Sequence, residues 1–543
     1  MDRARAPRPR ATGFGTDIEE SPVQEANFPR LLIPVVERQP DHLAVIGAYD
    51  GGYRATYAEH LDRVLRLKAA FGRELSLAEQ DRFAVLAGNS HRFLELWHAA
   101  LFGAGVINPL NPRLAASELE FILRDSRTRV IFVDSEHAPV ADRLRSTTGI
   151  EKVVLLDDGD LPHDIRYEDL VSAHAPAAAD EPDEDDVVVL MYTGGTTGTP
   201  KGVLLQQRAQ VSTIYHMDFM YRYFSHDDVC LLNTPMFHVA GCLGTMGTPA
   251  AGNVAVIQRS FDPASTIAAV EEHEVTLLGL VPTMISMLLA HPDFTPEKFR
   301  TVRGLAYGGS PMPEALIQRV LEVFPGCELF QVYGMTEMAA VLTCLRTAEH
   351  RGERARSAGR ALPGVRVEVH DPASGRPVPR GGVGEVVARS GSAMLGYWER
   401  PDETGHALRD GWYRTGDMGY LDDDGYLFLT DRLKDMIISG GENVYSTEVE
   451  NVLSSHPAVQ QAAVIGVPSE AWGEAVHAVV VVRDGHEVTE EELIGHARER
   501  LAGYKVPKSV ELRTEPLPMS AALKVLKREL REEYRAGDRS TRQ

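Results

Sequence analysis

A run of glycines, threonines and one lysine in this chain has the composition of a loop that binds phosphate. Residues 192–202 have the sequence YTGGTTGTPKG. Glycines allow backbone N–H groups to converge on an anion, threonine hydroxyls add donors, and lysine supplies a positive charge. The candidate phosphate-binding residues are Thr193, Gly194, Gly195, Thr196, Thr197, Gly198, Thr199, Pro200 and Lys201. We expect this loop to bind the phosphates of ATP.

The spacing within the run differs from that of a P-loop, in which a Gly-Lys-Ser/Thr sequence opens a helix. Here Lys201 lies between Pro200 and Gly202. The flanking residues 187–191 and 203–205 are apolar and rich in valine and leucine, which predicts a strand on each side of the loop. A surface turn rich in glycine and threonine is the alternative, and the length of the run argues against it.

The loop resembles the signature loop of the adenylate-forming (AMP-binding) superfamily. This superfamily contains acyl-CoA synthetases, aryl-CoA ligases, the adenylation domains of peptide synthetases and beetle luciferases. Other segments similar to its landmarks occur in the same order between Tyr57 and Lys524, which is nearly the whole chain. The resemblance implies an α/β fold with a large N-terminal region of stacked α/β subdomains, a β-rich subdomain and a small mobile α+β C-terminal domain. It also implies ATP, Mg²⁺ and CoA as cofactors and co-substrates.

Activation of a carboxylate by ATP brings one anion onto the α-phosphorus while another leaves. Two like charges at about 4 Å repel by roughly 4 kcal/mol at an effective dielectric constant of 20, so cations and dipoles must be preorganised. Residues 331–337, with the sequence QVYGMTE, offer candidates. The resemblance implies that Tyr333 stacks on adenine and that Thr336 holds the α-phosphate. It also implies that Glu337 binds Mg²⁺, a hard cation that prefers oxygen ligands.

Two further segments and one arginine complete the predicted nucleotide site. Gly308, Gly309 and Ser310 follow an apolar stretch, and glycine would let the backbone approach the edge of adenine because it has no Cβ. The resemblance implies that Asp417 accepts hydrogen bonds from the ribose hydroxyls and that Arg432 also reaches the nucleotide. Considered one at a time, these residues could equally form a tight turn and two solvated charges.

A lysine near the C-terminus resembles the adenylation lysine of the family. Lys524 would bridge the acyl oxygen and the α-phosphate and stabilise charge that grows in the transition state. The family usually has glycine before this lysine, whereas this chain has Leu523. Leucine disfavours positive φ, so the loop must follow another backbone path or carry strain. The nearby Lys527 is predicted to be a solvated helix residue.

Residues 235–241, with the sequence PMFHVAG, resemble the gate of the carboxylate pocket in acyl-CoA ligases. His238 would line the acyl site or the thiol tunnel, although a lone histidine in an apolar run is commonly a satisfied core residue. Relatives that activate amino acids carry an aspartate near this gate, and none stands at residues 237–241. A fatty or aryl acid is therefore favoured over an amino acid.

Apolar residues 281–284 and 338–342 are the predicted walls of the acyl pocket. Gly440 and Gly441 resemble a strand that faces the active site during thioester formation, where glycine would leave room for a pantetheine arm. The same two residues could instead form a turn. Lys434, in a charged segment without apolar periodicity, would be the pivot about which the small domain reorients, although an ordinary solvated linker would have the same composition.

Length, charge and cysteine usage limit the function classes. A chain of 543 residues exceeds the size of a single core, so two or more domains are expected. The formal charge of −22 argues against nucleic acid or an anionic membrane as the main partner. Four separated cysteines without C-x-x-C spacing are predicted to be reduced, buried thiols. With no secretory signal and no apolar run of about 18 residues, we expect a cytoplasmic monomer or homodimer.

Apolar strands alternate with amphipathic helices, which predicts a mostly parallel sheet with helices on both faces. The expected elements are a helix at 57–71, a strand at 83–87, a helix at 93–102, a helix capped by Ser117 and ending near Arg124, a strand at 130–133, a β-rich piece at 365–428, a helix at 448–453, strands at 462–467 and 476–482, and a helix at 490–501. The expected divisions are a flexible tail at 1–28, an adenylation domain at 29–431, a hinge at 432–435 and a lid domain at 436–543.

The predicted function is that of an AMP-forming acid–CoA ligase. The acid and ATP would give an acyl-adenylate and pyrophosphate, and the CoA thiol would then take the acyl group and release AMP. One alternative delivers the acyl group to a carrier-protein thiol or a nitrogen nucleophile, and a more distant one oxygenates the adenylate. A nucleotide-binding regulator without turnover is the alternative from another class, against which Lys201, Glu337, Asp417 and Lys524 argue.

Overall fold

The computed structural model describes most of the chain. The described residues are 26–49, 52–159, 161–193, 200–222, 227–433, 435–439, 442–469, 472–519 and 525–541. Arg432 is described by its backbone alone. The predicted site residues outside the described ranges are Gly194, Gly195, Thr196, Thr197, Gly198, Thr199, Lys434, Gly440, Gly441 and Lys524.

The first half of the large region is built on an eight-stranded, mostly parallel sheet with the strand order β19-β9-β8-β4-β3-β5-β6-β7. Its strands are β3 (Arg82–Leu86), β4 (Val106–Pro109), β5 (Val130–Val133), β6 (Lys152–Leu155), β7 (Ile165–Arg166), β8 (Val187–Thr193), β9 (Lys201–Gln206) and β19 (Gly396–Tyr397). The helices of this half are α2 (Tyr57–Arg73), α3 (His91–Leu101), α4 (Ala116–Asp125), α5 (Ala138–Arg145) and α6 (Tyr167–Ser172). Strand β8 is buried along most of its length, which explains its continuous apolar sequence.

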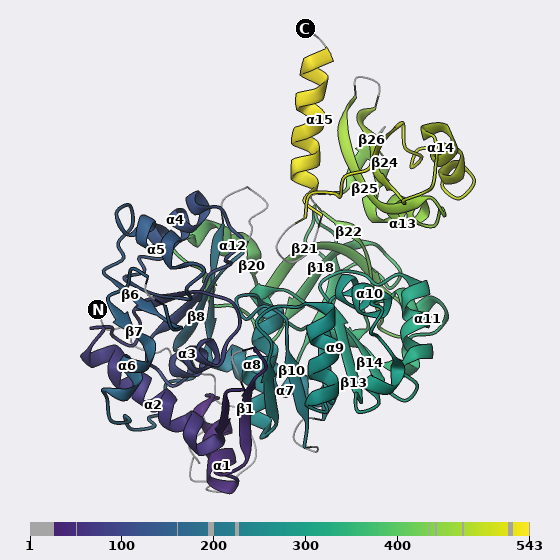
Figure 1. The fold of residues 1–543 in the computed structure, drawn as a ribbon. Helices are drawn as coiled ribbons and strands as arrows, with labels where there is room; N and C mark the ends of the chain where they lie inside the picture. The colour runs from purple at the N-terminus through teal and green to yellow at the C-terminus, as the bar shows by residue number, and fades with distance from the viewer. Residues whose placement is uncertain are drawn as a thin grey trace, which may run out of the picture.

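The second half is built on a nine-stranded sheet with the strand order β16-β15-β14-β13-β12-β10-β11-β1-β2. Its strands are β1 (Leu43–Gly47), β2 (Arg54–Thr56), β10 (Val229–Leu232), β11 (Val254–Ile257), β12 (Leu277–Leu280), β13 (Gly304–Gly308), β14 (Glu328–Tyr333), β15 (Thr343–Leu345) and β16 (Arg360–Ala361). Its helices are α1 (Pro29–Arg38), α7 (Gln207–Tyr221), α8 (Val239–Ala251), α9 (Pro263–Glu272), α10 (Pro282–Ala290) and α11 (Glu314–Val323). Figure 1 shows the two sheets side by side, with α7 and α8 between them.

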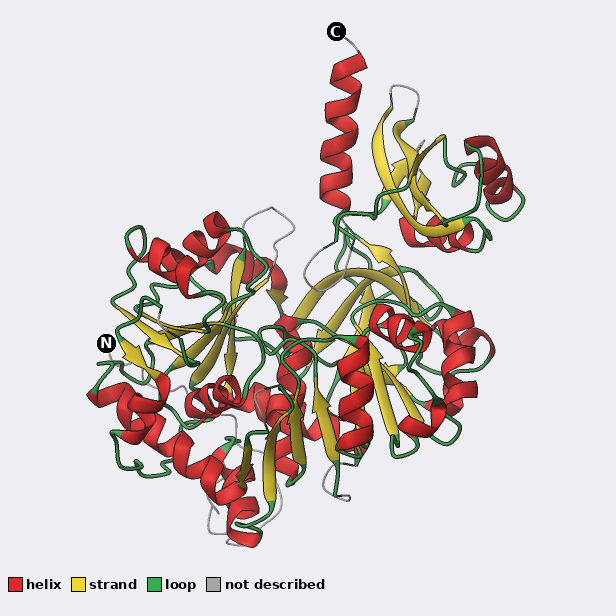
Figure 2. Ribbon diagram, in the orientation of Figure 1, coloured by secondary structure: helices red, strands yellow, loops and turns green. Residues whose placement is uncertain are grey.

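A third sheet contains the strands of the predicted β-rich piece, and its pairing is antiparallel. Its strands are β17 (Arg366–His370), β18 (Gly384–Arg389), β20 (Leu408–Arg409), β21 (Trp412–Leu421) and β22 (Leu427–Arg432), and α12 (Pro401–Ala407) precedes β20. Figure 2 shows this sheet between the two large sheets and the C-terminal unit. Strand β22 ends at the predicted hinge, so this sheet carries the connection.

The C-terminal unit is a small α+β fold with its own core. Its elements are β23 (Ile437–Ser439), β24 (Glu442–Val444), α13 (Ser446–Ser454), β25 (Val459–Ser469), β26 (Gly473–Val482), α14 (Glu490–Arg498), β27 (Ser509–Arg513) and α15 (Lys527–Thr541). Valines from both long strands pack against α13 and α14 in this core. In Figure 1 the unit stands above the large region, with α15 in yellow beside its sheet.

The structure confirms the predicted fold class, and most expected elements lie within a few residues of their predicted positions. The prediction that Ser117 caps α4 is wrong. Ala115 occupies the N-cap position, its N–H donates to Glu118, and Ser117 lies inside the helix. Phe28 is fully buried and its N–H donates to Gln207 at 3.2 Å, although the sequence assigned it to a flexible tail.

All four cysteines are buried and free, as predicted. Within the described ranges, no helix is both long enough and apolar enough to cross a membrane.

Candidate active site

Four of the predicted site segments lie at the carboxyl ends of neighbouring parallel strands of the nine-stranded sheet. Strands β10, β12, β13 and β14 are adjacent in the sheet. The segments that follow them are 233–238, 281–284, 309–310 and 334–337. In open α/β sheets, ligands bind outside the carboxyl ends of the strands. The fold therefore brings four sequence-distant segments to one edge.

The predicted phosphate loop joins the ends of an antiparallel hairpin. Thr193, the last residue of β8, pairs with Lys201, the first residue of β9. The Lys201 ammonium lies 5.3 Å from the ring centroid of Tyr397, which is brought there because β19 pairs with β9. A cation over an aromatic face is held by the ring quadrupole. The hairpin thus fixes the lysine at the base of the loop.

Tyr397 also connects the lysine to the predicted magnesium ligand. Its hydroxyl donates to Glu337 Oε1 at 3.0 Å, and the Glu337 carbonyl accepts from Met394 N–H at 2.8 Å. Burial and the Glu337 carboxylate raise the pKa of the Tyr397 hydroxyl above its usual value. The tyrosine therefore stays protonated as a donor and holds the carboxylate in place.

The turn that carries Thr336 and Glu337 has an unusual backbone. A short 3₁₀ helix (Thr336–Met338) is followed by Ala339 and Ala340 with φ values of 48° and 99°. Non-glycine residues in this region are strained, and such strain persists only where the surroundings enforce it. A Cβ on Gly334 would lie 1.9 Å from the Ala340 carbonyl oxygen, so this position admits only glycine. The turn is packed too closely to change shape freely.

The donor chemistry around Glu337 fits the predicted Mg²⁺. Mg²⁺ in ATP-dependent enzymes is bound by one or two carboxylates together with substrate phosphates and waters. Among the described residues, the single group of three potential metal ligands is Asp134, Glu136 and His137, and it does not include Glu337. A single carboxylate, linked through Tyr397 to Lys201 at the end of the predicted phosphate loop, is compatible with a magnesium ion bound together with a nucleotide.

Two residues predicted to recognise the nucleoside touch each other. The Tyr333 hydroxyl, at the end of β14, donates to Asp417 Oδ2 on β21 at 2.7 Å. Asp417 is buried to 9% exposure, and its Cα pairs with that of Arg432 across β21 and β22. The predicted adenine-stacking, ribose-binding and nucleotide-binding positions therefore meet where the nine-stranded sheet joins the β-rich sheet.

The glycines at the end of β13 have different structural reasons. A Cβ on Gly308 would lie 2.6 Å from the Val332 carbonyl oxygen, so close packing against β14 requires glycine there. Gly309 has a φ of 81°, a conformation that favours glycine, and is exposed. Ser310 follows it and is half-buried. This loop lies beside Tyr333 because Gly308 pairs with Val332.

His238 occupies the N-cap position of α8. Its Nδ1 accepts from the Ala240 N–H at 3.2 Å, which satisfies one of the first N–H groups of the helix. The side chain is half-buried rather than enclosed in the core. The structure thus gives this histidine a local structural role at the site edge, and its predicted place in the acyl site stays a prediction.

Polar contacts connect the end of β22 to the C-terminal unit. Ser446 at the start of α13 donates to both oxygens of Asp431, once from its N–H and once from its hydroxyl at 3.0 Å. The Lys527 ammonium donates to the Ser446 hydroxyl at 2.6 Å and pairs with Glu450 at 2.6 Å. With a side chain 13% exposed, Lys527 is not solvated, so that prediction is wrong.

Sequence reasoning missed Tyr397, Asp431 and the polar role of Lys527. Tyr397 follows a glycine in an unremarkable segment, and its contact with Glu337 depends on a strand pair between residues about 190 positions apart. The acidic residue Asp431, directly before the predicted hinge, was a signal that a polar contact could form there. Its partner Ser446 in α13 could not be derived without the tertiary structure.

Comparison with known proteins agrees with this geometry. Residues 34–398 match the family model described as AMP-binding enzyme, and residues 448–524 match that described as AMP-binding enzyme C-terminal domain. The chain is 40% identical over 495 residues to a feruloyl-CoA synthase from an Amycolatopsis species, covering 89% of this chain and 95% of the relative. It is 36% identical over 484 residues to the fatty acid–[acyl-carrier-protein] ligase ScoC from Streptomyces coeruleorubidus, covering 86% and 88% of the two chains.

A solved structure matches the fold along nearly the whole chain. ATP-bound MatB from Rhodopseudomonas palustris superimposes with a TM-score of 0.85 at 29% identity. The match covers 94% of this chain and 99% of the other. The arrangement of the large region and the C-terminal unit is thus similar to that of a protein crystallised with ATP.

Proposed function

This chain belongs to the AMP-binding enzyme family, and we propose that it is an AMP-forming acid–CoA ligase. It activates a carboxylic acid with ATP and transfers the acyl group to the thiol of CoA. The observation that carries the proposal is a pair of contacts at the end of β14. Tyr333 bonds to Asp417 of the β-rich sheet, and Glu337 bonds to Tyr397, which also lies against Lys201 of the eight-stranded sheet. These groups come from different strands, and together they match the charges and surfaces of a nucleotide.

In the first step, a carboxylate oxygen of the acid attacks the α-phosphorus of ATP. The bond from that phosphorus to the bridging oxygen breaks, and pyrophosphate leaves. Lys201 and the donors of its loop bind the phosphates, Thr336 holds the α-phosphate, and Lys524 offsets the charge that grows between acid and phosphate. Glu337 would hold Mg²⁺, which would further neutralise the phosphate charge.

The nucleoside is held by residues at the ends of β13 and β14 and on β21. Tyr333 presents its ring to adenine while its hydroxyl orients the Asp417 carboxylate for the ribose. Gly308, Gly309 and Ser310 lie beside that ring and accommodate the edge of the base. Arg432 lies opposite Asp417 and completes the set.

In the second step, the CoA sulfur attacks the acyl carbon. The bond from that carbon to the phosphate oxygen breaks, and AMP leaves. The C-terminal unit reorients about Lys434 so that Gly440 and Gly441 face the site and leave room for the pantetheine arm. The unit has its own core and its own sheet, which suits a rigid-body movement.

The proposed acid is fatty or aromatic. No aspartate stands at residues 237–241 to pair with a substrate ammonium group. The relative named as a feruloyl-CoA synthase supports an aryl acid within this class. Catalysis takes place in the cytoplasm, by a monomer or a homodimer, without nucleic acid or stable membrane insertion.

One alternative acceptor has specific support. The relative ScoC is named as a ligase that acts on an acyl-carrier protein. A carrier-protein thiol carries the same pantetheine arm as CoA, so the residues of the first step would be unchanged. The two alternatives therefore share the first step and differ only in the thiol that accepts the acyl group in the second.

Product analysis tests the proposal. Pyrophosphate release from ATP and Mg²⁺ is measured across fatty, benzoic and cinnamic acids, with and without CoA, and the products are identified by mass. An acyl-CoA and AMP from one acid class are expected. An acyl-adenylate that CoA never accepts would transfer the proposal to a carrier protein or a nitrogen nucleophile. ATP binding without turnover for any acid would leave a nucleotide-binding regulator.

A further inference from the structure

The segment that carries His238 is held by side chains from the other half of the large region. This segment, residues 233–238, connects β10 of the nine-stranded sheet to α8. Asn89 lies in the short connection between β3 of the eight-stranded sheet and α3, immediately before Ser90, the N-cap of α3. The Asn89 side chain reaches across the junction between the two sheets and is 2% exposed.

The Asn89 amide makes three hydrogen bonds to backbone groups of the opposite half. Its Nδ2 donates to the Thr234 carbonyl at 3.0 Å and to the Gln258 carbonyl at 3.2 Å. Its Oδ1 accepts from the Met236 N–H at 2.8 Å. The Asn89 N–H also donates to the Arg259 carbonyl at 3.0 Å. One residue thus binds the segments that follow both β10 and β11.

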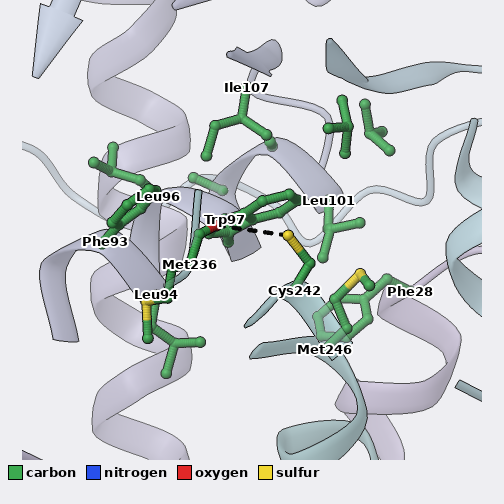
Figure 3. Close-up of a cluster of buried hydrophobic side chains, with 14 of the residues drawn as sticks. Phe28, Phe93, Leu94, Leu96, Trp97, Leu101, Ile107, Met236, Cys242 and Met246 are labelled. Atoms are coloured by element: carbon green, nitrogen blue, oxygen red, sulfur yellow. Dashed lines mark hydrogen bonds between the residues drawn. The ribbon is translucent and has the colours of Figure 1, made fainter. Parts of the chain in front are cut away.

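Side chains of α3 and α8 also contact this segment. The Trp97 Nε1 donates to the Met236 carbonyl at 3.2 Å, and the Cys242 thiol lies 3.5 Å from the same oxygen. Figure 3 shows Trp97, Met236 and Cys242 together in the apolar cluster. A Cβ on Gly241 would lie 2.0 Å from the Pro235 carbonyl oxygen, so α8 packs directly on this backbone. The N–H of Met236 is therefore bound by Asn89 and its carbonyl by Trp97, and both side chains come from the other half of the large region.

We propose that Asn89 is a positioning residue for the carboxylic acid. It fixes residues 234–236 and thereby places Phe237 and His238 at the entrance of the acyl site. The inference rests on the proposed function, because it assigns the segment to acid binding. The nucleotide groups Tyr333 and Asp417 are on other strands, so the effect of Asn89 is confined to the acid.

The chemistry of the amide makes a sharp substitution available. In Asn89→Asp the side chain keeps its shape and can still accept from the Met236 N–H. It can no longer donate to the Thr234 and Gln258 carbonyl oxygens, and its carboxylate is repelled by them. The variant thus releases the segment while it adds no volume to the core.

Asn253 provides a matched control. It is also a buried asparagine, 1% exposed, whose Oδ1 accepts from the Asp228 N–H at 3.1 Å. Asp228 precedes β10, so this bond lies at the end of the strand opposite His238. Asn253→Asp carries the same change in charge and burial without touching residues 234–238.

The test compares the steady-state constants of the full-length wild type, Asn89→Asp and Asn253→Asp with the best acid of the panel. Asn89→Asp is expected to raise the KM for the acid at least about tenfold, with the KM for ATP within about twofold of wild type. This range corresponds to the loss of one or two buried hydrogen bonds. Asn253→Asp is expected to lower the melting temperature and leave both KM values unchanged.

A second variant covers the case in which Asn89→Asp does not fold. Trp97→Phe removes the donor to the Met236 carbonyl and keeps most of the apolar packing, so a smaller rise in the KM for the acid is expected. Unchanged KM values for the acid in the folded variants would overturn this inference and leave the proposed function intact. An equal rise in the KM for ATP would also overturn it. A wild type that activates no acid would overturn the proposed function itself.

Discussion

The two parts of this molecule hold their site residues in different ways. In the large region, side chains from three sheets contact one another at the predicted site: Tyr333 bonds to Asp417, and Tyr397, which was not predicted, bonds to Glu337. At the entrance to the C-terminal unit, the connection is a short polar chain from Asp431 through Ser446 to Lys527. The predicted nucleotide site is therefore held by the framework of the large region, whereas the described link to the C-terminal unit is made by a few polar contacts.

This difference has a physical cause. Neighbouring parallel strands place their carboxyl ends side by side, so the sheet itself assembles part of the predicted ATP site. The C-terminal unit packs its own apolar core and meets the large region through polar groups, a combination that allows relative movement of domains. Variants in the two regions should accordingly separate effects on ATP binding, on adenylation and on the contacts of the C-terminal unit.

The largest expected effect is that of Lys524→Ala. Removing a preorganised group that stabilises transition-state charge costs about 10²- to 10³-fold in rate. We expect that loss in acid-dependent pyrophosphate release, with ATP binding retained. Acyl transfer from a supplied acyl-adenylate to CoA should be nearly unchanged, because that step does not use this lysine. An equal loss in both steps would contradict the assignment of the lysine to adenylation.

The next effect is expected at Gly334→Ala. The new Cβ would meet the Ala340 carbonyl oxygen and displace the turn that carries Glu337, so adenylation should fall by about 10²-fold, the size of a misplaced catalytic group. Gly495→Ala in α14 is the matched control, since no atom lies within 4 Å of the new Cβ. Its activity should equal that of the wild type. Wild-type rates in both variants would show that the turn does not position the site.

A third pair of variants divides the nucleoside site. Asp417→Asn should raise the KM for ATP about tenfold, because hydrogen bonds to a charged group contribute about 1.5–3 kcal/mol. Tyr333→Phe keeps the stacking surface and removes the bond to Asp417, so a smaller rise in the same constant is expected. The KM for ATP is measured in both variants and compared with that of the wild type. A larger effect of Tyr333→Phe than of Asp417→Asn would reverse the proposed order of roles.

The smallest expected effect on activity, and a clear effect on stability, is that of Lys527→Met. Burial raises the pKa of Glu450 above its usual value, and the nearby Lys527 opposes that rise. Loss of the lysine leaves a buried carboxylate unpaired, which costs about 3 kcal/mol. Lys505→Met is the control, because its partner Glu448 is 39% exposed and such pairs contribute under about 1 kcal/mol.

The sign of the pH dependence follows from the raised pKa. The folded state binds the Glu450 proton more tightly than the unfolded state, so stability falls as the pH rises through the interval between the two pKa values. Without Lys527 the folded-state pKa rises further. The stability deficit of Lys527→Met should therefore be largest at neutral pH and shrink as the pH falls below that pKa. A deficit that is independent of pH in denaturant titrations would contradict this account.

The predictability of the site from the sequence varied with the kind of contact involved. The two strands that flank the phosphate loop were predictable because their signal is local: runs rich in valine and leucine on either side of a glycine-rich segment. The candidate nucleotide residues were predictable because their motifs follow the order known from the family. Tyr397, Asn89 and Asp431 were not, because each acts on a residue that is distant in the sequence. Lys527 was misassigned because a lysine at a helix start gives no local sign of a buried partner.

The most direct test of the central claim is isotope exchange between labelled pyrophosphate and ATP in the absence of CoA. If the large region is preorganised to form an acyl-adenylate, exchange should require a fatty or aryl acid and Mg²⁺ and should proceed without any thiol. Lys524→Ala should lower the exchange rate by about 10²- to 10³-fold, while Lys527→Met should retain it at a temperature where the variant is folded. ATP binding with no acid-dependent exchange would contradict the account.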